Sequence, residues 1–482
     1  MVGEAKTDRL RSNTIGPWGL AALAIGITSP AMGLYGQWGP MQVAAGPITP
    51  LIFIAAMLLT LPTAISYALL NRHAPSSGSA STWLWISVSP ALGFLSGLAM
   101  ITYFAMATVA QPLIFALFFR DFIALIGLPV ADKIVLIVGV FVATIPVGVL
   151  GLRGVEASIR TAVMLMVVET LVVLALSATI LAVKGSVPGA INLSPFDPAM
   201  ATNGLAGFWA AMILGALGFC GFDVVSTAAE EAKAPREYLP KAILLTVVGI
   251  TIFWAINAWV FTLAVAPAAV VEYTAQGLTA VTPLAQMYWG GGSLAIILTA
   301  FTGVTAVYIS CMQGTSRLLF TLARHQLLPS WLGRLSGEGH VPRHAIIILL
   351  AATVTLDVVT LLILDNGLDS FVWWANGLVF FATLTFLAVN VANIAYFWRR
   401  SDVRFNVIGN LLVPLIGVLL NAYLLYAAFF QTLWNSDAST GRSVVVGCVL
   451  LFAIEIAVVA YMRLFRPHLF RREPPLCVEQ GR

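Results

Sequence analysis

The strongest constraint on this chain is a series of twelve long apolar runs, separated by polar or Pro- and Gly-rich segments. About 20 apolar residues are the length that an α-helix needs to cross the hydrocarbon core of a bilayer. Because lipid offers no hydrogen bonds, a spanning segment must satisfy its own backbone, and helices do so. We therefore predict an all-α polytopic membrane protein. The twelve predicted transmembrane helices lie at residues 17–44, 49–70, 91–119, 132–150, 161–183, 205–230, 241–265, 291–322, 345–364, 368–398, 407–430 and 444–465.

Composition supports a chain that is embedded in lipid along most of its length. Of its 482 residues, 60% are hydrophobic and only 10% are charged, whereas soluble chains carry about 25% charged residues. The net charge of +4 is modest, so we expect the lipid bilayer and not nucleic acid as a partner. The four cysteines show neither metal-ligand spacing nor a disulfide framework. We expect no metal and no cofactor.

The distribution of Lys and Arg predicts the orientation. If residues 1–16 lie in the cytoplasm, only four of the 25 Lys and Arg residues fall in outside segments, namely Arg120, Lys133, Lys184 and Arg442. Cytoplasmic loops carry an excess of Lys and Arg. We therefore predict a multi-pass protein of the cell membrane (plasma or inner membrane) with both termini cytoplasmic. Residues 1–16 show no pattern of a removable signal peptide.

Two of the predicted helices carry helix-breaking residues at their centres. The first contains Pro30 and Gly33, and the sixth contains Gly218 and Gly221 ahead of Asp223. Proline removes a backbone donor and clashes with the preceding turn, and glycine weakens a helix. Breaks at matching positions, five helices apart, favour a transporter built from two inverted repeats with its substrate site at the breaks. Simple kinks or close packing are the alternative.

Four motifs appear in a defined order along the chain. They are LPTAISYALLNRHAPSSGSASTWLWISVSPALGFLSGL after the start of helix 2, GLRGVEASIR before helix 5, FCGFDVVSTAAEEAKAPREYLPKAI in helix 6 and its exit loop, and SRLLFTLARHQLLPSWLGRL at the end of helix 8. Together with the topology, they resemble the amino acid–polyamine–organocation (APC) superfamily of permeases over nearly the full length. The form SPAMGLYGQWGP in helix 1 is similar to the amino acid/choline and GABA permease branch.

The resemblance implies a LeuT-type fold, with helices 1 and 6 unwound at mid-membrane. The predicted domains are a cytoplasmic tail (1–16), a first inverted repeat of helices 1–5 (17–183), a second of helices 6–10 (205–398), helices 11 and 12 (407–465), and a cytoplasmic tail (466–482). The resemblance also implies secondary active transport by alternating access, with the substrate between helices 1, 3, 6, 8 and 10. The substrate class is amino acids or related small organic amines. Symport and exchange, and a monomer and a homodimer, remain open.

Candidate substrate-binding residues surround the two predicted breaks and lie on helices 3 and 10. Freed N–H groups at a break suit an anionic group, and freed carbonyls suit a cation or an ammonium group. Aromatic rings suit ammonium through cation–π attraction, and core packing is the alternative for each. The predicted set is Thr28, Ser29, Ala31, Met32, Gly33, Tyr103, Phe219, Cys220, Gly221, Phe222 and Trp374.

Glu169 is an acid within helix 5, at a position where proton-coupled and sodium-independent relatives often carry Lys. A charged carboxylate in the membrane costs several kcal/mol unless it is paired, hydrated or protonated. We predict that Glu169 couples transport to protons. Three alternatives stay open, namely a sodium ion, the countercharge of a substrate ammonium, and a structural hydrogen bond. Asp223 is predicted to cap the second half of helix 6, and direct contact with the substrate is the alternative.

Charged residues at the exit of helix 6 are predicted to close a cytoplasmic gate. Glu230, Glu231 and Arg236 lie there, and Arg317 and Arg324 lie near the end of helix 8. Salt bridges between the two segments would break when the gate opens, and a solvated charged surface is the alternative. With the aromatic gate position that the resemblance implies, the predicted gate residues are Phe219, Glu230, Glu231, Arg236 and Arg317.

The sequence was also compared with the motifs of enzymes and the features of channels. It contains no HExxH, CxxC, Gly-x-Ser-x-Gly or Walker pattern, so we do not predict an enzyme. A sodium-coupled symporter or an exchanger of amines or polyamines is the alternative within the transporter class. A transporter-like receptor or a channel is the alternative from another class, although no filter-like loop is visible.

Overall fold

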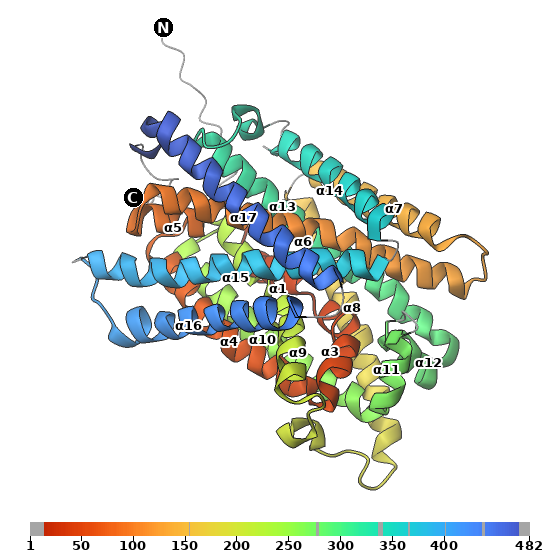
Figure 1. Cartoon of the computed structure of the whole chain (residues 1–482). Coiled ribbons are helices and arrows are strands. Elements are labelled where there is room, and N and C mark those ends of the chain that lie inside the picture. Colours follow the sequence, from red (N-terminus) through yellow and green to blue (C-terminus); the bar gives the residue numbers. More distant parts are fainter. Residues whose placement is uncertain are drawn as a thin grey trace.

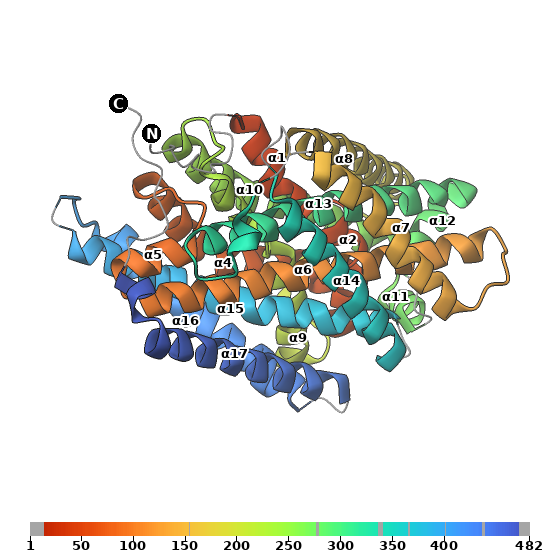
Figure 2. The ribbon, with the colours of Figure 1, turned by 90° about the horizontal axis from the view of Figure 1, so that it is seen from above.

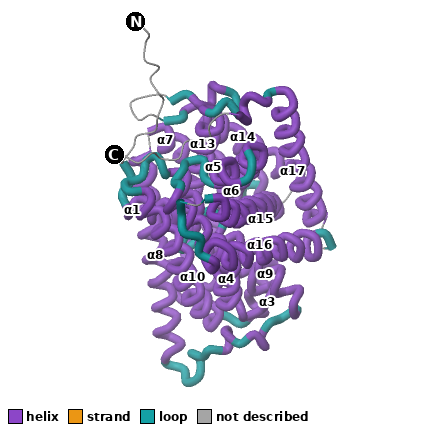
Figure 3. The backbone as a smooth tube through the Cα atoms, turned by 90° about the vertical axis from the view of Figure 1, so that its left-hand side faces the viewer, coloured by secondary structure: helices purple, strands orange, loops and turns teal. Residues whose placement is uncertain are grey.

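The computed structural model describes residues 14–471, apart from 154, 276–278, 336–340, 365–366, 401 and 436–438. Over this part of the chain the structure is helical and has no strand (Figures 1 and 3). Twelve of its helical segments are long and apolar enough to cross a membrane, which confirms the predicted number of spans. The chain is therefore an all-α, multi-pass membrane protein. Most of the two predicted tails falls outside the described residues.

The helical elements are given in chain order, where η denotes a 3₁₀- or π-helix. They are α1 (Pro17–Thr28), α2 (Met32–Tyr35), α3 (Trp38–Ala45), η1 (Gly46–Ile48), α4 (Thr49–His73), α5 (Ala80–Ser87), α6 (Pro90–Leu125), α7 (Asp132–Arg153), α8 (Val155–Gly185), η2 (Ser194–Phe196), η3 (Pro198–Met200), α9 (Gly204–Phe219), η4 (Phe222–Ala228), α10 (Pro235–Ala264), α11 (Pro267–Ala275), α12 (Val281–Trp289), η5 (Gly290–Ser293), α13 (Leu294–Arg324), η6 (Ser330–Gly333), α14 (Arg343–Leu364), α15 (Gly367–Arg399), η7 (Ile408–Leu412), α16 (Val413–Leu425), η8 (Tyr426–Leu433), α17 (Ser439–Phe465) and η9 (Pro467–Arg471).

The spans divide into a buried core and an outer layer. In an 18-residue apolar stretch of each span, 67% of the residues are buried in those that contain α6, α13 and α15, whereas only 28% are buried in those of α8, α14 and α17. Large apolar side chains such as Leu171, Ile363 and Leu450 are exposed on the outer spans, which is the surface that lipid requires. Figure 2 shows α8 and α17 on opposite sides of the bundle, with α4, α6 and α15 between them.

The predicted first span, 17–44, is three short helices in the structure. Its chain breaks between α1 and α2 and bends again between α2 and α3. The part from Trp38 onward joins the apolar run that leads into α4. Hydropathy alone did not separate these pieces because apolar residues continue through both interruptions.

Short helices between the spans were not predicted. One of them, α5, lies between α4 and α6, and α11 and α12 lie between α10 and α13. In α5, the buried indole of Trp83 donates a hydrogen bond to the carbonyl of Ala74 at 2.7 Å. This contact fixes α5 against the end of α4, and local sequence patterns do not show it.

Candidate functional site

The first span is interrupted between Thr28, where α1 ends, and Met32, where α2 begins. Pro30 lies inside this gap and has no N–H to continue the helix. Ser29 has a φ of +36°, a sparsely populated conformation that costs about 1–3 kcal/mol for a non-glycine residue. The carbonyl oxygen of Pro30 accepts the indole N–H of Trp254 from α10 at 2.9 Å. A distant helix therefore stabilises the interruption.

The sixth span is interrupted after Phe219, where α9 ends. Cys220 is extended, Gly221 has a φ of +114°, and a 3₁₀-helix then starts at Phe222. A Cβ atom at Gly221 would lie 1.7 Å from Cγ2 of Ile27 in α1. Both the backbone conformation and the lack of space require glycine here. The interruption in span 6 therefore packs directly against the end of α1.

A cavity lies beside the two interruptions. It is bounded by parts of the first, third, sixth, eighth and tenth spans. Its polar wall residues are Thr28, Gln37, Gln111, Cys220 and Cys311, and none of the described residues in its wall is charged. The cavity thus lies between the five helices that the resemblance implies for a substrate.

The predicted substrate residues divide between the cavity wall and the layer behind it. Thr28, Met32, Gly33 and Cys220 line the cavity. Ser29 and Ala31 instead contact a carboxylate from α8.

The predicted aromatic contacts are not part of the wall that the described residues form. Each is buried against another ring. The ring centroids of Phe219 and Trp254 are 5.4 Å apart, those of Phe222 and Phe386 are 5.3 Å apart, and those of Trp374 and Trp373 are 4.9 Å apart. In this conformation the three side chains take part in aromatic packing and not in the described cavity wall.

Glu169 of α8 reaches the interruption in the first span. Its Oε1 atom accepts the hydroxyl of Ser29 at 2.9 Å, and the backbone N–H of Ala31 also bonds to this carboxyl group. Its Oε2 atom has no hydrogen-bond partner among the described residues, and the side chain is fully buried. A Cβ atom at Gly303 of α13 would lie 2.1 Å from Oε2. The carboxyl group therefore lies between α8, α13 and the break.

Asp223 follows the interruption in the sixth span and is fully buried. Its carboxylate accepts the hydroxyl of Tyr103 at 3.0 Å and that of Tyr67 at 3.1 Å. The backbone N–H groups of Gly221 and of Asp223 itself also bond to it. Asp223 lies in the first turn of η4, whose N-cap is Gly221 without a side-chain cap. Tyr103, which binds this carboxylate, is not among the described residues of the cavity wall.

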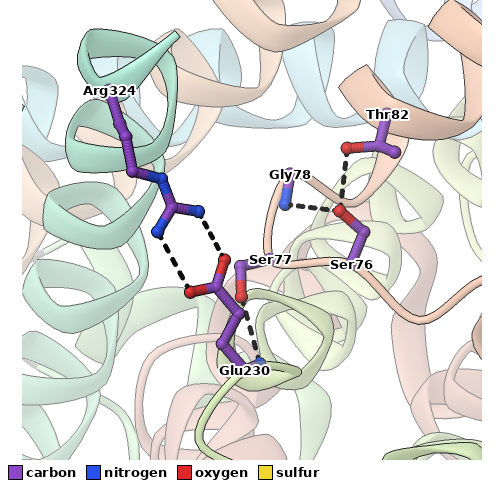
Figure 4. Close-up of polar contacts among 6 residues, drawn as sticks. All are labelled: Ser76, Ser77, Gly78, Thr82, Glu230 and Arg324. Atoms are coloured by element: carbon purple, nitrogen blue, oxygen red, sulfur yellow. Dashed lines mark hydrogen bonds and ion pairs between the residues drawn. The ribbon is translucent and has the colours of Figure 1, made fainter. Parts of the chain in front are cut away.

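Two ion pairs join the loop after η4 to α13. Their four residues are called the charge cluster, namely Glu230, Glu231, Arg317 and Arg324. Glu231 and Arg317 lie 2.7 Å apart (Oε2 to Nε), with only 4% and 1% of their side chains exposed. Arg324 donates to both carboxylate oxygens of Glu230, at 2.7 and 3.3 Å, and Ser77 accepts the backbone N–H of Glu230 (Figure 4). Burial raises the pKa of Glu231 above its ordinary value, and the Arg317 guanidinium opposes this increase.

The segment before α1 is attached to the same loop. The backbone N–H groups of Thr14 and Ile15 both donate to the carbonyl of Glu231 at 2.9 Å, and Lys233 donates its N–H to Ile15 at 2.8 Å. Of the predicted gate residues, Arg236 stands apart, because it is exposed and forms no ion pair with any described residue. Arg324 lies at the end of α13 and pairs with Glu230.

His325 directly follows the charge cluster at the end of α13. Burial and the neighbouring Arg324 guanidinium lower the pKa of His325 to about 4. The imidazole is therefore neutral at physiological pH.

Several residues of the site were not found from the sequence, Trp254, Gly303 and Gln37 among them. Trp254 bonds to the first interruption and fills the space beside Gly33, where a Cβ atom would lie 2.2 Å from its Cε2 atom. Gly303 leaves room for Glu169, and Gln37 lines the cavity. Glycine and glutamine in an apolar run were visible signals, but only the three-dimensional contacts assign them a partner.

Comparison with known proteins gives a consistent result. The profile of a family described as amino acid permease matches residues 15–454. The chain is 26% identical to the branched-chain amino acid permease BcaP of Bacillus subtilis (strain 168), over 77% of this chain and 81% of that protein.

Two further relatives handle other solutes, according to their names. The low-affinity putrescine importer PlaP of Escherichia coli (strain K12) is 24% identical, over 77% of this chain and 78% of its own. A methylthioribose transporter of Bacillus subtilis (strain 168) is 24% identical, over 69% and 71%.

Proposed function

The chain belongs to the amino acid permease family, within the APC superfamily, and on that premise we propose that it is a proton-coupled secondary transporter of amino acids or related small amines. The family and the relatives are transporters of small organic solutes and not enzymes. The finer assignments, namely the coupling ion, the mechanism and the residues, are proposals. They rest on the geometry of the two interrupted spans.

The observation that carries this proposal is the contact of Glu169 with the first interruption. An ionised carboxylate that is fully buried, with one oxygen unpartnered, is costly in a membrane protein. Its partners are Ser29 and Ala31 in the break. If alternating access moves the break, it changes the cost of ionising Glu169. Proton binding and the conformation of the first span are then linked, and each shifts the other.

A sodium-coupled symporter or exchanger is the second candidate, and one observation favours it. The unpartnered Oε2 atom of Glu169 offers a hard cation an anionic oxygen. Thr302 and Thr305 flank Gly303 in the sequence of α13, and their hydroxyls donate to carbonyls of their own helix, at 2.9 and 2.7 Å, and keep lone pairs free. We rank the proton first because a hard cation needs several oxygen ligands, and Gly303 contributes no side chain.

We assign the gate to the charge cluster and to the chain segment that precedes α1. Opening toward the cytoplasm requires α1 to separate from the loop that carries Glu231. That movement breaks the backbone hydrogen bonds of Thr14 and Ile15 and loosens the pair with Arg317. In this scheme residues 17–183 and 205–398 are the two inverted repeats, and both termini are cytoplasmic.

The test is uptake into proteoliposomes that contain the full chain. Labelled amino acids, GABA, choline, ethanolamine and putrescine are offered with a pH gradient, with a sodium gradient or with neither. Accumulation above the outside concentration is expected with the pH gradient, because a coupled carrier concentrates its solute. Glu169→Gln keeps the hydrogen-bonding shape and removes the proton-binding group, so accumulation is expected to fall to simple equilibration.

The matched control is Glu455→Gln. Glu455 is also buried and accepts the hydroxyl of Thr102, but it lies on α17, away from the interruption. This variant is expected to accumulate solute like the wild type. Sodium-driven accumulation would mean that Glu169 binds sodium and not a proton. Equilibration without accumulation under any gradient would favour a channel. A wild-type chain that moves no member of the panel would refute the transporter proposal.

A further inference from the structure

The wall of the cavity has an uneven chemistry. Apolar side chains from five spans make up most of it, for example Ile27, Ile114, Leu217 and Leu378, while none of its described residues carries a charge. The two buried acids at the breaks belong to other contacts, because Glu169 is bonded to the first break and Asp223 to two tyrosines. A second positive charge on a solute would therefore find no counterion in the wall.

The side-chain oxygen of Gln37, a residue of the wall, is buried without a partner among the described residues. Gln37 lines the cavity with only 8% of its surface exposed, and its Oε1 atom has no hydrogen bond from any described residue. A Cβ atom on Gly218, just before the second interruption, would lie 2.8 Å from this oxygen. A buried carbonyl oxygen without a donor costs about 1–3 kcal/mol. A solute that supplies an N–H group would recover this cost.

We infer that the cavity selects solutes with one ammonium group and an uncharged, apolar side chain, and that Gln37 is the specificity residue that accepts the ammonium N–H. The inference rests on the proposed transport function and deepens it. An amide oxygen accepts one N–H bond from the ammonium of a zwitterion. It cannot neutralise the second ammonium of a diamine or of a basic amino acid, which would stay unpaired among apolar groups.

The experiment compares norleucine, lysine and putrescine as competitors of labelled norleucine in proteoliposomes of the full-length protein. Lysine extends the norleucine side chain by a terminal ammonium group, so the pair isolates the effect of that charge. Norleucine is expected to compete at least tenfold more strongly than lysine or putrescine. If lysine or putrescine competes equally well, the inference fails while the transport function stands. If labelled norleucine is not taken up but another panel member is, the inference also fails alone.

Variants of Gln37 test the residue. Gln37→Leu is expected to weaken norleucine competition at least tenfold, and Gln37→Glu is expected to shift preference toward lysine. Gln42→Leu is the matched control, because Gln42 lies outside the cavity wall and donates to Thr262 at 2.6 Å. Norleucine competition in Gln37→Leu that equals the control would overturn the assigned role.

A second measurement needs no variant and is independent of folding defects. Cys220 and Cys311 both line the cavity, so a bound solute should shield their thiols from a maleimide reagent. Labelling of the wild type, read by mass spectrometry, is expected to fall with norleucine and to stay unchanged with lysine. Equal protection by lysine would overturn the inference. If no solute protects the thiols, the cavity is not the transport site, and that part of the transport proposal fails as well.

Discussion

At the residue scale, Gly303 determines where the carboxyl group of Glu169 lies. The site of a Cβ atom at Gly303 is only 2.1 Å from Oε2 of Glu169, and separations under about 3 Å force atoms to move. Gly303→Ala is therefore expected to displace the carboxyl group from Ser29. Gradient-driven uptake should fall as in Glu169→Gln, although the acid is still present.

Gly249→Ala is the control for this change. A Cβ atom at Gly249 of α10 would meet no heavy atom within 4 Å, so uptake should match the wild type. Gly303→Ala protein that accumulates solute normally would show that Glu169 does not need this position.

His325 gives a pH prediction at the same scale. Its pKa is about 4 in the folded protein and about 6.5 in an unfolded chain. Between these values the unfolded state binds more protons, so the free energy of unfolding decreases as the pH falls. The slope approaches about 1.4 kcal/mol per pH unit for a single group. The melting temperature in detergent, measured at pH 7 and pH 5, should fall less for His325→Gln than for the wild type, and an equal decrease would contradict the assignment.

At the scale of elements, the junction of α9 and η4 depends on Gly221. Alanine there would adopt an unfavourable φ of +114° and would place a Cβ atom 1.7 Å from Ile27. Strain and overpacking each cost about 1–3 kcal/mol, so Gly221→Ala is expected to lower the melting temperature and to reduce uptake. Gly291→Ala, where a Cβ atom has open space, should change neither. Normal stability of Gly221→Ala would mean that the junction relaxes without cost.

The elements also show which part of the structure could be read from the sequence. The twelve spans and both breaks follow from apolar length and from Pro and Gly positions, which are local properties. The partners of each break do not, because Trp254 lies 224 residues from Pro30 along the chain. In the same way, the pairing of Glu230 with Arg324 and not with Arg236 depends on where α13 ends relative to the loop. The sequence predicted salt bridges between the two segments but did not assign individual partners.

At the scale of the whole molecule, the charge cluster joins the loop after η4 to α13, and the segment before α1 is bonded to the same loop. The pair of Glu231 and Arg317 is almost fully buried, whereas that of Glu230 and Arg324 is more exposed. Removing one partner of a buried pair costs about 3–5 kcal/mol, and a partly exposed pair contributes about 1 kcal/mol or less. Arg317→Gln is therefore expected to destabilise the protein much more than Arg324→Gln, as measured by melting temperature.

The same two variants separate stability from gating. Arg324→Gln should fold normally and open more readily, so thiol labelling of Cys220 from the loop side should be faster than in the wild type. Lys241→Gln is the control, because Lys241 pairs with Glu237 on the exposed surface of α10. Slower labelling in Arg324→Gln would argue against the cluster as a closing contact.

The hydrogen bonds between Thr14 and Glu231 also have a consequence for the order of events during biosynthesis. The two residues are 217 positions apart. A ribosome that adds about 5–20 residues per second needs roughly 10–40 s to cover that distance. The first helix is therefore synthesised before its partner, and the hydrogen bonds to Glu231 can form only after the sixth helix and its loop have been made. A lesion in that loop would leave a correctly inserted first helix without its anchor, and quality-control proteases would meet the nascent protein at its N-terminal end.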